Sequence, residues 1–387
     1  MTPAARYAAA IALIDEIAGG APAEKALTTW GRQNRFAGSR DRAAIRDVVY
    51  DVLRGWRSLA ALGGGETGRA RVLGLLRREG IAPESVFGAG GYGPAPLSED
   101  EARSGRTPVG AEALDLPDWL WPLWQDALGP EAEAAARRAQ HRAPLGLRVN
   151  LSRGPRAEAQ ARLAEDGITT VEAEEVATGL IVTDGGRKLA QSAAYAEGLV
   201  EVQDVSSQIA MAALPITPGM RVLDYCAGGG GKALALADRG AQVVAHDADP
   251  GRMADIAPRA ARAGVSILCR ATAELGREAP FDLVLCDAPC SGSGTWARSP
   301  QAKWALTPEA LERYTALQRD VLDAAAPLVA PGGFLAYATC SVLTAENDGT
   351  LRGFAAAHPG WREITRRVLV PQDTHDGFFL ALLQSEV

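Results

Sequence analysis

Two thiols and a carboxylate stand directly after apolar runs of this sequence. Residues 281–286 form one such run, which ends at Asp287 and Cys290 and is followed by a loop rich in glycine and serine. A second run, residues 333–339, ends at Cys340. In an open α/β sheet, ligands bind outside the carboxyl ends of the strands. An acid and thiols delivered to such an edge are therefore placed to carry out chemistry on a bound ligand.

A glycine-rich turn supplies a second feature of the same kind. Residues 221–226 predict a strand that leads into the glycines at 228–231, and glycine lets the backbone approach a ligand closely at a helix N-terminus. The turn is not a phosphate-binding P-loop, because Ala233 stands where that motif needs serine or threonine. Asp247 ends the next predicted strand, where an acid can bind a ribose hydroxyl. This combination suits a nucleoside-containing cofactor, and S-adenosylmethionine is one.

The composition is that of a globular protein with a large core. Of 387 residues, 47% are hydrophobic and 22% charged, which allows two or three domains. No apolar stretch approaches the ~20 residues that span a bilayer, and we expect a cytoplasmic protein with no membrane partner. The five cysteines form no CxxC pair and the histidines lack ligand spacing, so we expect neither disulfides nor a metal site. Cys269 and Cys286 lie inside apolar runs and are expected to be buried and inert.

The order of the predicted elements gives the fold class. Residues 1 to about 139 read as helices, a small α/β unit follows from Pro144, and the remainder alternates strands and helices as a parallel sheet does. We therefore predict an α/β fold with boundaries at 1–135, 136–200 and 201–387. The expected strands of the last region are 221–226, 241–247, 265–269, 281–286 and 334–340, the expected helices are 232–239, 250–263 and 308–329, and residues 367–370 and 378–383 are expected to form a closing hairpin.

Arginines surround the apolar stripe of the helix predicted near residues 45–56. The net charge of -7 does not exclude a local basic face, because nucleic-acid binding follows the distribution of charge. Arginine suits phosphate contact, which favours an RNA-binding face, whereas spacing alone equally allows an ordinary solvated helix face. The arginines are Arg32, Arg35, Arg40, Arg42, Arg46, Arg54 and Arg57.

Several motifs together resemble the Sun/RsmB-type RNA cytosine-carbon-5 methyltransferases of bacteria. The segments Asp287–Gly292, Lys303-Trp304 and 338–347 resemble the family's signature motifs, and 223–232 resembles its cofactor loop. Residues 39–54 are similar to the NusB-like RNA-binding domain of one branch of the family. The resemblance covers nearly the whole chain, and the pattern of two cysteines is highly specific.

The resemblance implies a Rossmann-like class I methyltransferase domain preceded by a NusB-like all-α domain and a small RNA-recognition-like domain. Cys340 would be the nucleophile that adds to carbon-6 of cytosine, so that carbon-5 can attack the methyl group of S-adenosylmethionine. Asp287 would hydrogen-bond the base, Cys290 would assist the later elimination, and Lys303 would lie close to the reacting base. The residues that the resemblance assigns to the cofactor are Cys226, Ala227, Gly228, Gly229, Gly230, Gly231, Lys232, Asp247 and Asp287.

Two positions depart from the family's pattern. Proline usually stands where this chain has Gly229, so the cofactor loop should be more flexible. The family's acid after the third strand is missing from Cys269–Thr272, and Thr272 or Glu274 could replace its contact with adenine.

We expect a monomer that methylates RNA, in particular small-subunit ribosomal RNA. One alternative is an RNA-binding ribosome-assembly factor whose cofactor loop has lost activity. Another is a DNA cytosine methyltransferase with Cys290 as nucleophile, which would leave Cys340 unexplained.

Overall fold

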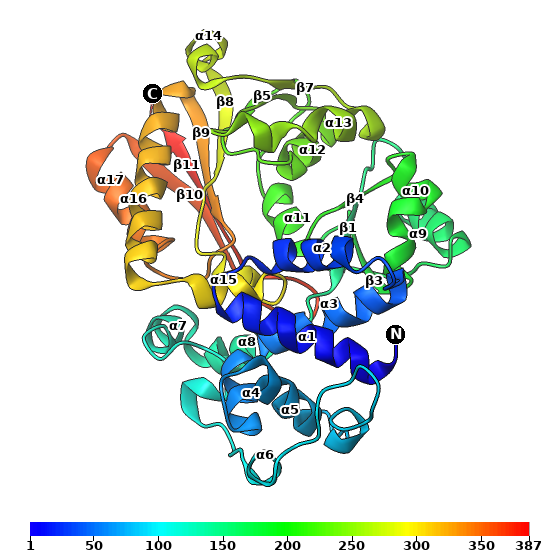
Figure 1. Ribbon diagram of the computed structural model, residues 1–387. Helices are drawn as coiled ribbons and strands as arrows, with labels where there is room; N and C mark the ends of the chain where they lie inside the picture. Colours follow the sequence, from blue (N-terminus) through cyan, green and yellow to red (C-terminus); the bar gives the residue numbers. More distant parts are fainter. Residues whose placement is uncertain (387) are drawn as a thin grey trace. The chain divides into compact units, whose positions relative to one another are not determined.

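The computed structural model describes residues 1–386, which form two compact units (Figure 1). One unit is helical and contains residues 1–142 together with residues 296–305. The other contains residues 143–295 and the chain from Leu306 onward. A short segment from the catalytic half of the sequence thus belongs to the N-terminal helical unit.

The helical unit is built from amphipathic helices around one apolar core. Thr2 caps the first helix by accepting a hydrogen bond from the Ala5 amide. Residues at helical spacing, among them Ile14, Ile45 and Val49, are buried together in this core. The predicted helical character of residues 1–139 is confirmed. The helices are α1 (Pro3–Ala18), α2 (Ala23–Gln33), α3 (Ser39–Arg54), α4 (Trp56–Gly63), α5 (Gly68–Arg78), α6 (Glu99–Arg103), α7 (Trp121–Leu128), α8 (Ala132–Ala139) and α15 (Pro300–Ala305).

The segment 296–305 packs into the helical unit through aromatic and polar contacts. Trp296 stacks on Trp124, with ring centroids 5.4 Å apart. The buried Arg54 donates from Nε to the carbonyl oxygen of Ala297 at 2.8 Å, and Trp304 Nε1 donates to the Leu53 carbonyl at 2.7 Å. These contacts hold the segment against α3 and α7.

The small α/β part carries an antiparallel sheet in the order β2-β3-β1-β4. Its core contains Leu147 and Val149 from the central strand and Leu163 from the helix that covers it. The elements are β1 (Leu145–Val149), α9 (Arg156–Glu165), β2 (Thr169–Glu172), β3 (Gly179–Asp184), α10 (Ala193–Ala196) and β4 (Val200–Val202).

The large sheet has the order β10-β11-β9-β8-β5-β6-β7 within the described residues. The strands from β7 to β9 run parallel, and β11 and β10 add antiparallel strands at the β9 side. This is the mostly parallel, class I methyltransferase-like sheet that the sequence predicts. The strands are β5 (Arg221–Asp224), β6 (Gln242–Ala245), β7 (Ile267–Cys269), β8 (Phe281–Asp287), β9 (Val329–Thr339), β10 (Trp361–Leu369) and β11 (Phe378–Ser385).

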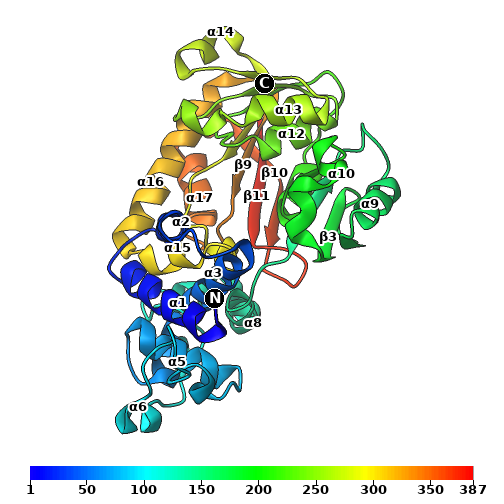
Figure 2. The same cartoon turned by 45° about the vertical axis from the view of Figure 1, so that its right-hand side comes forward.

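Helices cover both faces of this sheet (Figure 2). Alternate residues of β8 point to opposite faces: Leu283 and Leu285 join the core under α11 and α12, whereas Val284 and Cys286 join the core under α16 and α17. A central strand buried on both faces explains why residues 281–286 read as a continuous apolar run. The helices are α11 (Val205–Ala212), α12 (Gly231–Asp238), α13 (Ile256–Ala263), α14 (Leu275–Glu278), α16 (Pro308–Ala325) and α17 (Asp348–Ala357).

Some local expectations are wrong. The predicted helix 250–263 is divided into a 3₁₀ turn, Pro250–Met253, and α13. Strand β9 begins at Val329, five residues before the predicted start. Cys286 is buried as expected, but Cys269 is exposed because it ends β7 at the sheet's edge. Within residues 1–386, no helix combines the length and apolarity needed to cross a membrane.

Truncation of Trp296 tests whether segment 296–305 belongs to the fold of the helical unit. Trp296 is 1% exposed, so Trp296→Ala should lower the free energy of unfolding by about 3–5 kcal/mol through loss of buried aromatic area. Denaturant unfolding monitored by circular dichroism measures this value. Leu123→Ala is the control, because Leu123 is 40% exposed and should change stability little. Equal effects of the two substitutions would contradict the assignment.

Candidate active site

The two thiols meet at the carboxyl ends of neighbouring strands. Asp287 of β8 pairs with Ala338 of β9, and the chain after each strand leads to one cysteine. The sulfur atoms of Cys290 and Cys340 lie 3.3 Å apart. The structure therefore brings together Cys290, Cys340 and Asp287, the two thiols and the acid that the sequence predicts at these strand ends.

A buried carboxylate, that of Glu346, joins the two loops that carry the thiols. Glu346 Oε1 accepts from the Ser291 amide at 2.8 Å and from Gln318 Nε2 at 3.0 Å. Its Oε2 accepts from the hydroxyls of Ser291, at 2.5 Å, and of Ser341. Ser291 follows Cys290 and Ser341 follows Cys340, so one fully buried acid fixes both loops. Glu346 lies within the sequence motif 338–347, but the motif alone assigns it no role.

The shared hydrogen bond makes the two thiols chemically different. It lowers the pKa of Cys340 below that of an ordinary thiol, with the Lys232 ammonium acting in the same direction against burial and the charge of Asp287. The same bond, together with burial, raises the pKa of Cys290 well above its usual range. The arrangement therefore favours ionisation of Cys340 over that of Cys290.

Lys232, at the start of α12, connects the glycine turn to the thiols. Its Nζ donates to Asp287 Oδ2 at 2.5 Å. Asp224, the last residue of β5, lies beside this pair, and within residues 1–386 neither of its carboxylate oxygens has a partner that meets hydrogen-bond geometry. Burial, with the nearby charge of Asp287, raises the pKa of Asp224 to about 7. Sequence reasoning missed Asp224, although its position directly before the glycine turn was a usable signal.

The glycines leave the backbone of the turn accessible, because they carry no side chains that would cover it. Gly228 and Gly230 adopt φ of 49° and 78°, which favours glycine at both positions. Asp247 is buried after β6 and accepts from the Gly228 amide at 3.0 Å. Cys226 is half-buried, and the amide of Ala227 donates to the carbonyl of His246 at 2.8 Å. Gly229 and Gly231 complete the turn into α12.

Lys303 lies in the helical unit on α15, and none of the interactions described for the thiols or for Asp287 involves it. It is fully buried, its Nζ has no hydrogen-bond partner among the described residues, and it lies 4.6 Å from the centroid of the Trp304 ring. Burial lowers the pKa of Lys303 to about 8, and the charge of Asp115 opposes that shift. The structure thus gives no contact in support of the expected position beside a reacting base.

Both residues suggested for the adenine side take part in local hydrogen bonds. Thr272 Oγ1 lies 2.8 Å from His246 Nε2, and Glu274 accepts from the Ala271 amide at 2.9 Å. The contact of either side chain with adenine stays a prediction.

The predicted arginine face separates into structural and exposed members. Arg54 is buried, and Arg57 donates to the Leu116 carbonyl and to Asp118, so these two belong to the fold. Arg32, Arg35 and Arg40 are exposed.

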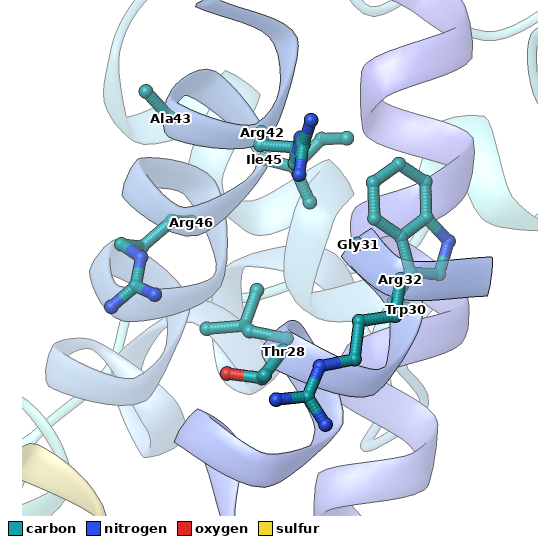
Figure 3. A pocket seen from close by; sticks show the side chains of 9 residues that line it. Thr28, Trp30, Gly31, Arg32, Arg42, Ala43, Ile45 and Arg46 are labelled. Carbon is teal, nitrogen blue, oxygen red and sulfur yellow. The ribbon is translucent and has the colours of Figure 1, made fainter. Parts of the chain in front are cut away.

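A pocket between α2 and α3 adjoins these exposed arginines. Arg32, Arg42 and Arg46 line it together with Trp30 and Gly31 (Figure 3). Its volume is about 460 Å³. Phe36, in the loop between the two helices, is 73% exposed. This part of the helical unit thus offers both cations and aromatic rings at its surface.

Within residues 1–386, no group of three or more His, Cys, Asp or Glu side chains could hold a metal ion. The site consists instead of a glycine turn, acids and thiols at the carboxyl ends of parallel strands. This fold and this site define a class I methyltransferase.

Comparisons with known proteins specify the family. A model described as "16S rRNA methyltransferase RsmB/F" matches residues 211–384, and one for an RsmF/B-like ferredoxin-like domain matches residues 116–187. The chain is 29% identical to ribosomal RNA small subunit methyltransferase B of Vibrio cholerae, over 98% of this chain and 97% of that protein. It is 35% identical to the protein of the same name in Xanthomonas campestris, over 71% and 68% respectively.

A solved structure agrees with the fold. A methyltransferase homolog from Pyrococcus horikoshii has a TM-score of 0.62 and 24% identity, and the match covers 71% of this chain and 97% of that one. With the family model and the relatives, this places the protein: the chain belongs to the RsmB/F family of 16S rRNA methyltransferases.

The charges around Cys340 should control the pH at which it reacts. Alkylation by iodoacetamide can be followed for each cysteine by peptide mass spectrometry over a range of pH. The midpoint pH of alkylation should be lower for Cys340 than for Cys290. Lys232→Met should raise that midpoint because it removes a cation, whereas Asp287→Asn should lower it because it removes an anion. Lys188→Met, at an exposed lysine, is the control. Shifts of the same sign for Lys232→Met and Asp287→Asn would contradict the assignment.

Proposed function

We propose that this enzyme transfers a methyl group from S-adenosylmethionine to carbon-5 of a cytosine in small-subunit ribosomal RNA, through a covalent bond between Cys340 and the base. The observation that carries the proposal is the 3.3 Å approach of the Cys290 and Cys340 sulfurs beside Asp287. Two thiols of opposite pKa shift at one strand edge suit a reaction that needs a nucleophile and a second proton-handling group.

The residues around the glycine turn fit a cationic nucleoside cofactor. S-adenosylmethionine supplies an electrophilic methyl group on a sulfonium and also carries an ammonium group. Asp224 would meet the positive charge, because its buried oxygens lack partners. Gly228 to Gly231 would let the cofactor approach the backbone at the start of α12, and Asp247 would accept from a ribose hydroxyl. Cys226, Ala227, Lys232 and Asp287 complete the cofactor-binding set.

Cys340 would begin the reaction. Its thiolate would add to carbon-6 of cytosine, forming an Sγ–carbon bond and shifting electron density to carbon-5. Carbon-5 would then bond to the methyl carbon as the methyl–sulfur bond breaks and S-adenosylhomocysteine leaves. Asp287, held by Lys232 through Oδ2, would bind the edge of the base and stabilise the ring as charge develops. The lowered pKa of Cys340 raises the fraction of thiolate at neutral pH.

Cys290 would act in the second half of the reaction. The proton on carbon-5 would pass to water, and the electron pair of that bond would restore the double bond between carbon-5 and carbon-6. The Sγ–carbon-6 bond would break at the same time, and its electron pair would return to Cys340. Cys290 lies within contact of the departing sulfur and, with its raised pKa, carries a proton to donate to it. This supports a role in product release.

The helical unit would bind the RNA around the target. Exposed Arg32, Arg35 and Arg40 can neutralise phosphates, and Phe36 can stack on an unpaired base. The target base itself must leave its stack to reach the thiols. An assembly factor without activity is the second candidate, since Gly229 departs from the family's loop; the complete set of thiols and acids favours the enzyme.

Substitution of each thiol should give a different outcome. Cys340→Ala should abolish methyl transfer and leave binding of S-adenosylmethionine intact, because it removes only the nucleophile. Cys290→Ala should accumulate a covalent protein–RNA adduct, because release fails after attack. Methyl incorporation into rRNA and denaturing gels of enzyme–RNA mixtures measure both effects.

The Cys290→Ala, Cys340→Ala double variant is the control for this pair, and it should form no adduct. Substantial turnover by Cys340→Ala would remove Cys340 as nucleophile. Absence of S-adenosylmethionine binding at millimolar concentration would favour the assembly factor.

The exposed arginines should contribute to RNA affinity but not to cofactor affinity. Alanine at Arg32, Arg35 and Arg40 together should weaken RNA binding and reduce the slope of log K against log salt by up to about 3, roughly one per lost phosphate contact. Filter binding at several salt concentrations measures both quantities. The control is alanine at three exposed but carboxylate-paired arginines of the same unit, Arg103, Arg106 and Arg137. Equal loss in both triple variants would contradict a specific RNA face.

A further inference from the structure

Arg259 of α13 occupies the space beside the glycine at which this chain departs from its family. A Cβ atom built on Gly229 would lie 3.3 Å from Arg259 Nη1. The same nitrogen donates a hydrogen bond to the carbonyl oxygen of Gly229. Gly229, unlike Gly228 and Gly230, does not adopt a positive φ. The backbone conformation at this position therefore does not demand glycine, whereas the neighbouring guanidinium does disfavour a side chain.

Arg259 is itself held in place by a buried acid. Its Nε and Nη2 donate to Glu201 Oε2 at 3.2 and 3.0 Å, and Glu201 is only 1% exposed. Arg262, one turn further along α13, donates to the other oxygen of Glu201 and lies over the Tyr195 ring at 4.3 Å. Breaking such a buried, charge-assisted pair is costly, so the position of Arg259 is well determined.

The acid comes from the small sheet, and a second residue near it also contacts the turn. Glu201 lies in β4, and Gln203 directly follows that strand. Gln203 Nε2 donates to the Gly231 carbonyl at 3.1 Å. The carbonyls of Gly229 and Gly231 are thus both reached from β4, that of Gly231 directly by Gln203 and that of Gly229 through Glu201 and Arg259. The four-stranded sheet supports the cofactor loop from outside the methyltransferase sheet.

We propose that Arg259 is a positioning residue for the cofactor loop and that its hydrogen bond to the Gly229 carbonyl restricts a turn built from four glycines. A proline restricts the loop by fixing one dihedral angle, and a charge-assisted bond to a carbonyl restricts it by holding one peptide plane. The identity of the ligand, S-adenosylmethionine, rests on the proposed function.

Calorimetric titration of S-adenosylmethionine into the full-length protein tests the proposal. Arg259→Ala should weaken binding about tenfold or more, as expected for loss of a hydrogen bond to a charged group, and should raise the KM for S-adenosylmethionine while kcat at saturation stays nearly unchanged. Arg262→Ala is the matched control: it also removes a partner of Glu201 but leaves the bond to Gly229 in place, and it should change affinity less than about threefold on the same scale. Thermal unfolding confirms that both variants fold.

Substitution of Gly229 by proline gives an independent test. The sign of its effect on S-adenosylmethionine affinity should differ between the wild-type and the Arg259→Ala backgrounds. In the wild-type background Gly229→Pro should weaken binding, because the ring meets the Arg259 guanidinium. In the Arg259→Ala background it should strengthen binding, because the space is free and proline stiffens the loop. The same sign in both backgrounds would overturn the proposal.

The outcomes separate this inference from the proposed function. If the wild-type protein binds S-adenosylmethionine, two results would overturn the role of Arg259 and leave the function standing. One is an affinity of Arg259→Ala within about twofold of the wild type, and the other is an equal loss of affinity in the Arg259 and Arg262 variants. No binding by the wild-type protein would overturn the function itself.

Discussion

The buried carboxylate of Glu346 is the constraint on which the geometry of this site depends. A charge removed from water is costly unless hydrogen bonds compensate it, and here the compensating donors come from Ser291, Ser341 and Gln318. Because two of these residues follow the two cysteines, neither thiol can move without leaving a donor or the carboxylate unpaired. The 3.3 Å separation of the sulfurs, and with it the opposite shifts of their pKa values, follows from this arrangement.

Charge balance at the edge of the sheet connects the thiols to the cofactor turn. Asp224 and Asp287 end the neighbouring strands β5 and β8, and their like charges raise the free energy of the ionised pair. Lys232, a single cation between two carboxylates, forms an ion pair with Asp287 and acts on Asp224 through its charge. The remaining carboxylate makes the edge a suitable place for a cation, and the same lysine lowers the pKa of Cys340. One residue thus acts on both halves of the proposed reaction.

The polypeptide chain connects the helical unit, which we propose binds RNA, to the loop that carries Cys290. The loop that carries Cys290 continues directly into residues 296–305, which belong to the helical unit through Trp296 and Trp304. Similarly, the strand β4 of the small sheet reaches the cofactor turn through Glu201 and Arg259. The small sheet therefore contributes to how the glycine turn is held.

The sequence alone determined the helical first third, the small α/β part, the parallel strands and the placement of Asp287, Cys290 and Cys340 at strand ends, because hydrophobic periodicity and glycine turns are local signals. It could not determine what depends on contacts between distant segments. Burial lowers the pKa of Lys303 against the opposing charge of Asp115, which is nearly two hundred positions away. Cys269 is exposed because its apolar run forms the outer strand of the sheet. The contacts of Glu346 and Arg259 also appear only in three dimensions, because the cost of burying a charge depends on which partners the fold brings to it.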